Sequence, residues 1–169
     1  MRAEEQEKAL DRFLFPRLTW GFFLRIALLG IGTWIVGTRF LRPMVVDGAS
    51  MEPTYSAQGF NFCVLTAFKT ERPQRGQVVT LKYGGYKYML LKRVLAFEGE
   101  TVEFREGRCY VNGVPLEEPY VRKSCDWTVP PHVVAVGNVY VMGDNRSVPF
   151  EQHVGGEIAV SRVAGRPLW

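Results

Sequence analysis

The chain has 169 residues, about the length of one domain with a single hydrophobic core. Its 21 Lys and Arg against 17 Asp and Glu give a mild basic excess without a long run of like charges, so the composition argues against a nucleic-acid partner. The cysteines Cys63, Cys109 and Cys125 have neither CxxC spacing nor a histidine cluster nearby. Neither a zinc site nor a disulfide framework is therefore predicted, and we expect inert thiols.

The first element in chain order is an apolar segment at 20–40, WGFFLRIALLGIGTWIVGTRF, whose one internal charge, Arg25, can reach the headgroups. Its length matches the ~20 residues that a helix needs to cross a bilayer. A buried core helix is disfavoured because strand-like sequence follows, and a cleavable signal peptide because the flank lacks an A-x-A site. We predict a cytoplasmic tail at 1–18, an uncleaved transmembrane helix at 19–40 and a folded domain at 41–169.

The basic residues around this segment predict its orientation. More of them precede the span than follow it, the first group being Arg2, Lys8, Arg12 and Arg17 and the second Arg39 and Arg42. Since Lys and Arg are retained on the cytoplasmic side, we expect the N-terminus in the cytoplasm and the domain on the outer side of the membrane.

Short runs rich in Val, Tyr, Phe and Leu follow, separated by Gly, Pro and Asn. They include NFCVLT, QVVTLKY, KYMLLKRVLAF, TVEFR and VVAVGNVYVMG, and they predict an all-β domain of antiparallel strands. Asn112-Gly113 predicts a type I′ hairpin. Residues 117–132, which contain three prolines, predict a long loop.

Ser50 is the first candidate catalytic residue, in the stretch GASMEPTY beside the small residues Gly48 and Ala49. A serine hydroxyl needs a neighbouring base to become a good nucleophile, and histidine is the usual one. The chain has two histidines, His132 and His153. By itself the stretch is equally typical of an ordinary turn.

Lys92 offers another base. In KYMLLKRVLAF the adjacent cations Lys92 and Arg93 fall on opposite faces of a strand, and the residues that share Lys92's face are Tyr88, Leu90, Val94 and Ala96. An amine among apolar side chains loses its proton more readily. The alternative is an edge strand that holds the ammonium in water. A third stretch, VMGDNRSVPFEQH, runs from a strand into a Gly-Asp-Asn turn, which alone indicates a hairpin end.

In this order the three stretches resemble the boxes of the type I signal peptidases of bacteria and the related mitochondrial inner-membrane peptidases. GASMEPTY is similar to the serine box, RGQVVTLKY to the strand box, LLKRVLAFEGE to the lysine box, YVNGVPLEEPYV to the family linker and GDNRS to the closing box. The resemblance implies an antiparallel β-sheet signal-peptidase fold with an N-terminal transmembrane helix. It also implies a serine endopeptidase that removes signal peptides from exported preproteins without a metal or cofactor.

Carried over by motif, Ser50 corresponds to the nucleophile and Lys92 to the general base, and the Ser50 backbone N–H is expected to stabilise the oxyanion. Where many relatives add a serine hydroxyl, this chain has Gly48. The residues expected to support the site come from the serine and closing boxes: Gly48, Ala49, Asp144, Asn145, Arg146 and Ser147.

The chain departs from the family pattern most in the closing box. A serine, an aspartate, a serine and an arginine are replaced by Pro149, Glu151, Gln152 and His153, while Gln77 replaces an acid and the sequence 97–100 replaces Leu-Pro-Gly-Asp. Pro149 has no group to hold the lysine amine. We expect either that Ser147, a water or a backbone carbonyl orients Lys92 or that the site is weakened, and we expect Glu151 and His153 to form a bracing pair.

The resemblance leaves three functions open: a general signal peptidase, a specialised paralogue with few substrates, and an inactive homologue that binds extended peptides. The intact Ser50 and Lys92 favour an enzyme. We expect signal peptides with small residues at the first and third positions before the cut. The expected partners are these peptides, the lipid bilayer and the export machinery, with no nucleic acid. The expected location is the bacterial cytoplasmic membrane, with the mitochondrial inner membrane as the alternative.

Overall fold

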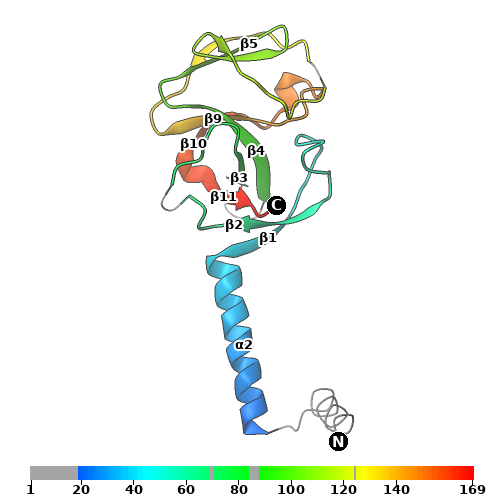
Figure 1. Cartoon of the computed structure of the whole chain (residues 1–169), viewed down its shortest axis with the longest axis vertical. Coiled ribbons are helices and arrows are strands. Elements are labelled where there is room, and N and C mark those ends of the chain that lie inside the picture. Colours follow the sequence, from blue (N-terminus) through cyan, green and yellow to red (C-terminus); the bar gives the residue numbers. More distant parts are fainter. Residues whose placement is uncertain (1–18, 69–70, 84–87, 124) are drawn as a thin grey trace, which may run out of the picture. The chain divides into compact units, whose positions relative to one another are not determined.

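The computed structural model describes residues 19–68, 71–83, 88–123 and 125–169. The chain divides into two units, Met1–Arg39 and Phe40–Trp169, each described here by itself. The tail predicted at 1–18, with its four basic residues, lies outside the described residues. The described element of the first unit is helix α2 (Trp20–Arg39), drawn in blue in Figure 1.

Helix α2 falls within the span predicted at 19–40 and is long and apolar enough to cross a membrane. None of its residues is buried against other described parts of the chain, which a core helix would require. Its last turn carries Arg39, which favours the negative end of the helix dipole.

The β unit confirms the prediction of an antiparallel all-β domain. In its described residues one sheet has seven strands in the order β1-β2-β11-β3-β4-β9-β10, all paired antiparallel (Figure 1). Their bounds are β1 (Leu41–Val45), β2 (Phe60–Val64), β3 (Val78–Tyr83), β4 (Tyr88–Phe97), β9 (Asn138–Met142), β10 (Gly156–Ala159) and β11 (Val163–Pro167).

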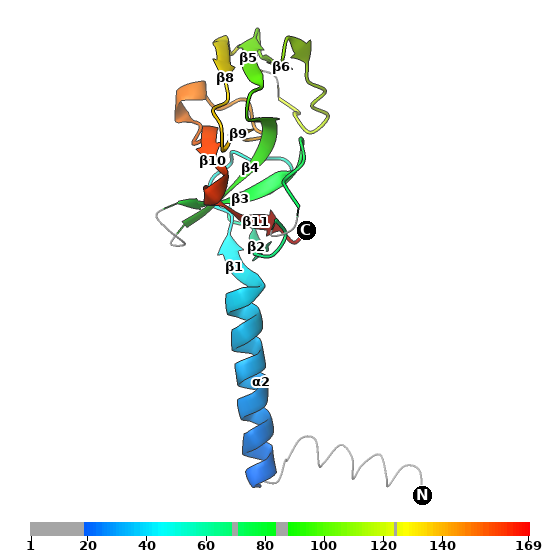
Figure 2. The ribbon, with the colours of Figure 1, turned by 90° about the vertical axis from the view of Figure 1, so that its left-hand side faces the viewer.

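A second sheet has the order β7-β6-β5-β8, and Figure 2 shows its strands at the upper end of the β unit. The strands are β5 (Thr101–Arg105), β6 (Arg108–Val111), β7 (Val114–Pro115) and β8 (Val129–Val133). Asn112 and Gly113, with φ of 53° and 77°, join β6 to β7, so the predicted type I′ hairpin is confirmed. Two short 3-10 helices, η1 (Phe150–Gln152) and η2 (Val160–Arg162), complete the described elements.

The loop predicted at 117–132 was wrong at its C-terminal end. Residues Val129–Val133 form strand β8, which pairs with β5 although it contains Pro130 and Pro131. Proline cannot donate to a ladder, but β8 is the last strand of its sheet and needs partners on one side only. Strands β10 and β11 were not predicted either, and β11 pairs with both β2 and β3.

Strand β4 carries Lys92 through the centre of the large sheet, between β3 and β9. Leu90 and Val94 pack in one hydrophobic cluster, as predicted for a single strand face. Ala96 packs in a different cluster because the pairing with β9 shifts register between Val94 and Ala96. The predicted alternation therefore ends at this bulge, and the side chain of Tyr88 lies outside the described residues.

Candidate active site

The structure brings Ser50 and Lys92 together. The Lys92 Nζ donates a hydrogen bond to the Ser50 Oγ at 2.9 Å, although the two residues are 42 positions apart. Lys92 projects from β4, opposite Val79 of β3, and only 2% of it is exposed. Its amine is therefore held in the interior of the domain, with the Ser50 hydroxyl as its hydrogen-bond partner.

Burial lowers the pKa of Lys92 to about 8, and the nearby Asp144 charge acts in the opposite direction. The charged form is disfavoured because the interior solvates an ammonium poorly. Below pH 8 the amine is mostly protonated and cannot accept a proton from Ser50. Above it, the neutral amine is able to do so.

The Ser50 loop is held by the start of the closing box. The Asn145 backbone N–H donates to the Ser50 carbonyl at 3.0 Å, and its Nδ2 donates to the Ala49 carbonyl at 3.0 Å. Within the loop, the Glu52 N–H donates to the Ala49 carbonyl. Gly48 has a φ of +85°. Because this backbone conformation favours glycine, no side-chain hydroxyl is present at this position.

Gly143 allows the closing box to approach the Ser50 loop closely. A Cβ at Gly143 would lie 2.2 Å from the Ser50 carbonyl oxygen and 3.2 Å from the Ser50 Cβ. Only glycine leaves room for the Ser50 backbone at this position.

Asp144 is fully buried and its carboxylate has three donors. Arg93 donates from Nε and Nη2 at 2.8 and 2.5 Å, and the Thr54 hydroxyl donates at 2.5 Å. Arg93 also donates from Nη1 to the Gly76 carbonyl. A buried carboxylate needs such pairing, so these contacts fix Asp144 and the adjacent Asn145.

Arg146 is held by a residue that the sequence did not indicate. Its guanidinium is 1% exposed and donates from both Nη atoms to Glu118, while its Nε donates to the Gly143 carbonyl. The Tyr120 hydroxyl donates to the same Glu118 carboxylate, and the Tyr120 ring lies under Arg93. In the sequence, Glu118 is marked only by its place in LEEPYV, where two acids stand near an aromatic residue. This stretch has no helical or strand periodicity that would indicate which way the Glu118 side chain points.

Two expectations for the closing box are wrong. The Ser147 hydroxyl donates to Asn145 Oδ1 at 2.6 Å and does not contact Lys92. His153 packs edge-on against Trp127 at 4.8 Å and forms no ion pair with the exposed Glu151, both being described residues. Burial, with the charges of Lys92 and Arg146, lowers the pKa of His153 to about 4. The ring lies near the backbone of Val148 and Asn145, but neither of its buried nitrogens makes a hydrogen bond within the described residues.

His132 lies in β8, and its ring bonds the Glu157 carboxylate of β10. Within the described ranges, no three His, Cys, Asp or Glu side chains are grouped as metal ligands would be. All three cysteines are free thiols.

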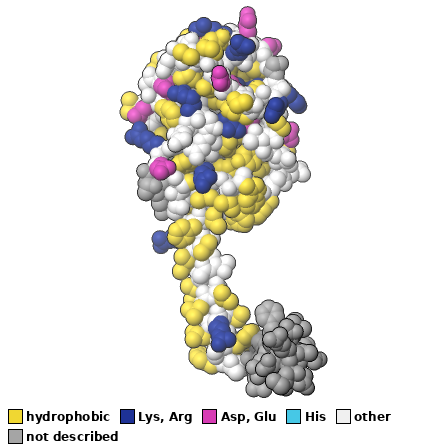
Figure 3. All heavy atoms as spheres, viewed as in Figure 1, with side chains coloured by type: hydrophobic (Ala, Val, Ile, Leu, Met, Phe, Trp, Pro, Cys, Tyr) yellow, Lys and Arg dark blue, Asp and Glu magenta, His cyan; other side chains and the backbone are white. Residues whose placement is uncertain are grey.

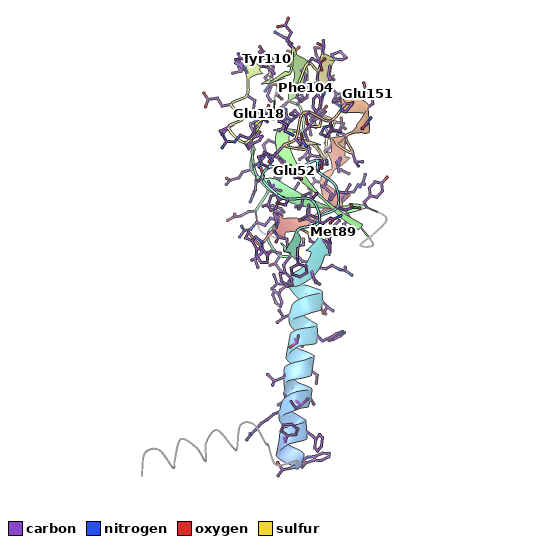
Figure 4. All side chains as sticks on the ribbon, turned by 90° about the vertical axis from the view of Figure 1, so that its right-hand side faces the viewer. Glu52, Met89, Phe104, Tyr110, Glu118 and Glu151 are labelled. Atoms are coloured by element: carbon purple, nitrogen blue, oxygen red, sulfur yellow. The ribbon has the colours of Figure 1, made fainter. Side chains whose placement is uncertain are left out.

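A groove of about 630 Å³ lies between β1 with its following residues and the start of β4, and its lining residues Asp47 and Leu90 come shortly before Ser50 and Lys92 in the chain. Figure 4 labels Met89 at this lower end of the β unit, well separated from Glu118 and Phe104 in the upper part. The walls of the groove are largely apolar, and the side chains of Asp47 and Arg42 also line it. The lining residues include Met44, Val45, Val46, Met89 and Leu90.

A serine hydroxyl bonded to a buried lysine amine is the arrangement that a serine hydrolase with a lysine base requires. The family model "Signal peptidase, peptidase S26" matches residues 17–168. The chain therefore belongs to the signal peptidase family S26.

Individual relatives agree with this family. The chain is 30% identical to signal peptidase I T of Bacillus subtilis, over 94% of this chain and 87% of that protein. It is 28% identical to thylakoidal processing peptidase 1 of Arabidopsis thaliana, over 75% of this chain but only 41% of that protein's length. A solved signal peptidase I from Enterococcus faecalis aligns with 57% of this chain and 97% of its own, at 26% identity and a TM-score of 0.47.

Proposed function

We propose that the chain is a membrane-anchored signal peptidase that cuts signal peptides from exported preproteins with Ser50 as nucleophile and Lys92 as general base. The observation that carries this proposal is the 2.9 Å hydrogen bond between the two side chains, combined with burial that lowers the pKa of Lys92 to about 8. Such an amine takes the serine proton as Ser50 attacks the scissile carbonyl, and then gives it to the leaving amine.

The oxyanion is stabilised in this proposal by the Ser50 backbone N–H. In the described part of the chain that N–H donates to no backbone carbonyl, while the Ser50 carbonyl is already held by Asn145. Since Gly48 supplies no hydroxyl, backbone donation carries this role, and Gly48, Ala49 and the 144–147 turn keep the loop in place.

The substrate lies extended in the groove beside β1. β1 ends its sheet and pairs with β2 on one side only, so its other side is free to bond a peptide backbone within the described residues. The apolar groove walls receive small side chains at the first and third positions before the cut. The polar side chains in the groove wall, including Arg42, Asp47 and Gln58, supply polar contacts to the substrate.

The division into a tail at 1–18, an anchor at 19–40 and a peptidase domain at 41–169 is part of the proposal. We place the N-terminus in the cytoplasm and the domain on the outer side of a bacterial cytoplasmic membrane. Exposed apolar residues support contact of the domain with lipid: Val45, Phe60 and Trp169 are each more than half exposed. Figure 3 shows hydrophobic side chains gathered over the lower part of the β unit.

The purified full chain in detergent tests the function directly. Incubation with a preprotein that has alanine at the first and third positions before its cleavage site should release the mature protein, identified by its N-terminal mass. Ser50→Ala should leave the preprotein intact, and leucine at the first position should prevent cleavage. An uncut preprotein with the unmodified chain would contradict the function.

A further inference from the structure

One loop holds both arginines that lie beside the proposed catalytic pair. Arg93 follows Lys92 in β4, and its Cζ lies 3.9 Å from the centroid of the Tyr120 ring. Arg146 donates from both Nη atoms to the Glu118 carboxylate, and the Tyr120 hydroxyl donates to that carboxylate at 2.9 Å. Glu118 and Tyr120, which lie between β7 and β8, therefore hold Arg146 and Arg93 in place.

Arg93 is in turn the main partner of the Asp144 charge. Two of its nitrogens reach the Asp144 carboxylate, and its side chain is only 11% exposed. Asp144 is the charge that favours the protonated form of Lys92. If the Arg93 guanidinium moved away from Asp144, the carboxylate charge would be poorly compensated in the interior, where the dielectric constant is low. That charge would then stabilise the protonated form of Lys92 more strongly.

The Tyr120 ring is suited to keep Arg93 in place. It covers one face of the guanidinium while Asp144 occupies the edge, so the ring excludes water and adds a cation–π attraction that is largest for desolvated groups. The Tyr120 hydroxyl donates to Glu118, and burial raises the pKa of that hydroxyl, which therefore remains a donor.

We propose that Tyr120 is a positioning residue whose ring holds Arg93 on Asp144 and so keeps Lys92 able to accept the Ser50 proton. The inference rests on the proposed peptidase function. Tyr120 is not part of the groove wall, and Figure 4 shows Glu118 far from Met89. The ring therefore acts on the chemical step and not on substrate binding.

The other titratable groups near Lys92 change their protonation state in other pH ranges than Lys92 does. Asp144 and His153 of the closing box lie close enough to interact with the Lys92 charge, Arg146 also acts on His153, and Arg93 and Tyr55 interact with Asp144. His153, with a pKa of about 4, is neutral wherever Lys92 titrates, and burial raises the pKa of Tyr55. Activity between pH ~6 and ~9 thus reports mainly on Lys92.

The test measures kcat and KM against pH for the full chain in detergent, with the alanine-containing preprotein as substrate. Tyr120→Leu removes the aromatic ring, so the midpoint of the rise in kcat should move up by roughly one pH unit. Because only the neutral amine is active, this shift lowers kcat about tenfold at pH values below both midpoints. KM should stay within about twofold.

Tyr120→Phe is the matched control, since it keeps the ring over Arg93 and loses only the hydroxyl. It should keep the midpoint of the unmodified chain to within a few tenths of a pH unit. Thermal unfolding checks that each variant is folded, and Tyr120→Met replaces Tyr120→Leu if the latter does not fold.

An unmoved midpoint in the folded Leu or Met variant would overturn the positioning role even if kcat falls, because the fall would then be structural. An equal shift in Tyr120→Phe would overturn the role of the ring. Failure of the unmodified chain to cleave would contradict the proposed function instead, so the two failures are distinguishable.

Discussion

Gly143→Ala is expected to inactivate the enzyme through the position of Ser50. The added Cβ would lie 2.2 Å from the Ser50 carbonyl oxygen, whereas such contacts are normally longer than 3.0 Å. The Ser50 backbone must therefore retreat by about 1 Å, which also disturbs its hydrogen bond from Asn145. A displacement of this size at a reacting group lowers kcat roughly 100-fold.

Gly165→Ala provides a control of the same steric severity. Gly165 lies in β11, which β3 separates from the Lys92 strand β4, and its Cβ would lie 2.1 Å from the Val64 carbonyl oxygen. Both substitutions should destabilise the domain by about 1–3 kcal/mol, as overpacking does, and thermal unfolding measures this loss. Only Gly143→Ala should lose kcat per folded molecule in the preprotein assay. Cleavage by Gly143→Ala within twofold of the unmodified chain, or an equal kcat loss in Gly165→Ala, would refute the reasoning.

Three further predictions concern charge and topology. Cleavage should rise with pH around a midpoint near 8, as Lys92 loses its proton, and a rate that is flat from pH ~6 to ~9 would contradict a lysine base. Asp144→Asn should lower the free energy of unfolding by about 3–5 kcal/mol in urea titrations, because it leaves the buried Arg93 charge unpaired; a loss below about 1 kcal/mol would mean that the pair is solvated. Protease added to spheroplasts of a bacterial host should digest residues 41–169, and full protection would overturn the proposed orientation.

The sequence predicts those features that depend on local pattern or on motif order. Alternation and turn residues predict the β domain, and Asn112-Gly113 predicts its hairpin because both positions require positive φ. The proximity of Ser50 and Lys92 follows from the order of the family boxes, and the structure places the two atoms 2.9 Å apart. The catalytic roles of these residues remain proposals.

Features that depend on distant partners could not be predicted. Glu118 and Arg146 are 28 positions apart, and nothing in their spacing indicates that they pair. Strand β8 was missed because its two prolines indicate a loop unless its place at the sheet edge is known. Ser147 is a plausible partner for Lys92 by composition, but the turn directs its hydroxyl to Asn145 instead.

The identity of the base is the central claim, and kcat for Lys92→Ala and His153→Ala, compared with Ser50→Ala, tests it most directly. Lys92→Ala should lose activity almost as completely as Ser50→Ala, and the Ser50→Ala/Lys92→Ala double variant should be no worse, because members of one catalytic pair act as a unit. His153→Ala should keep substantial activity with some loss of thermal stability, since its ring packs on Trp127. An inactive His153→Ala beside an active Lys92→Ala would contradict the Ser50/Lys92 mechanism and assign the base to His153.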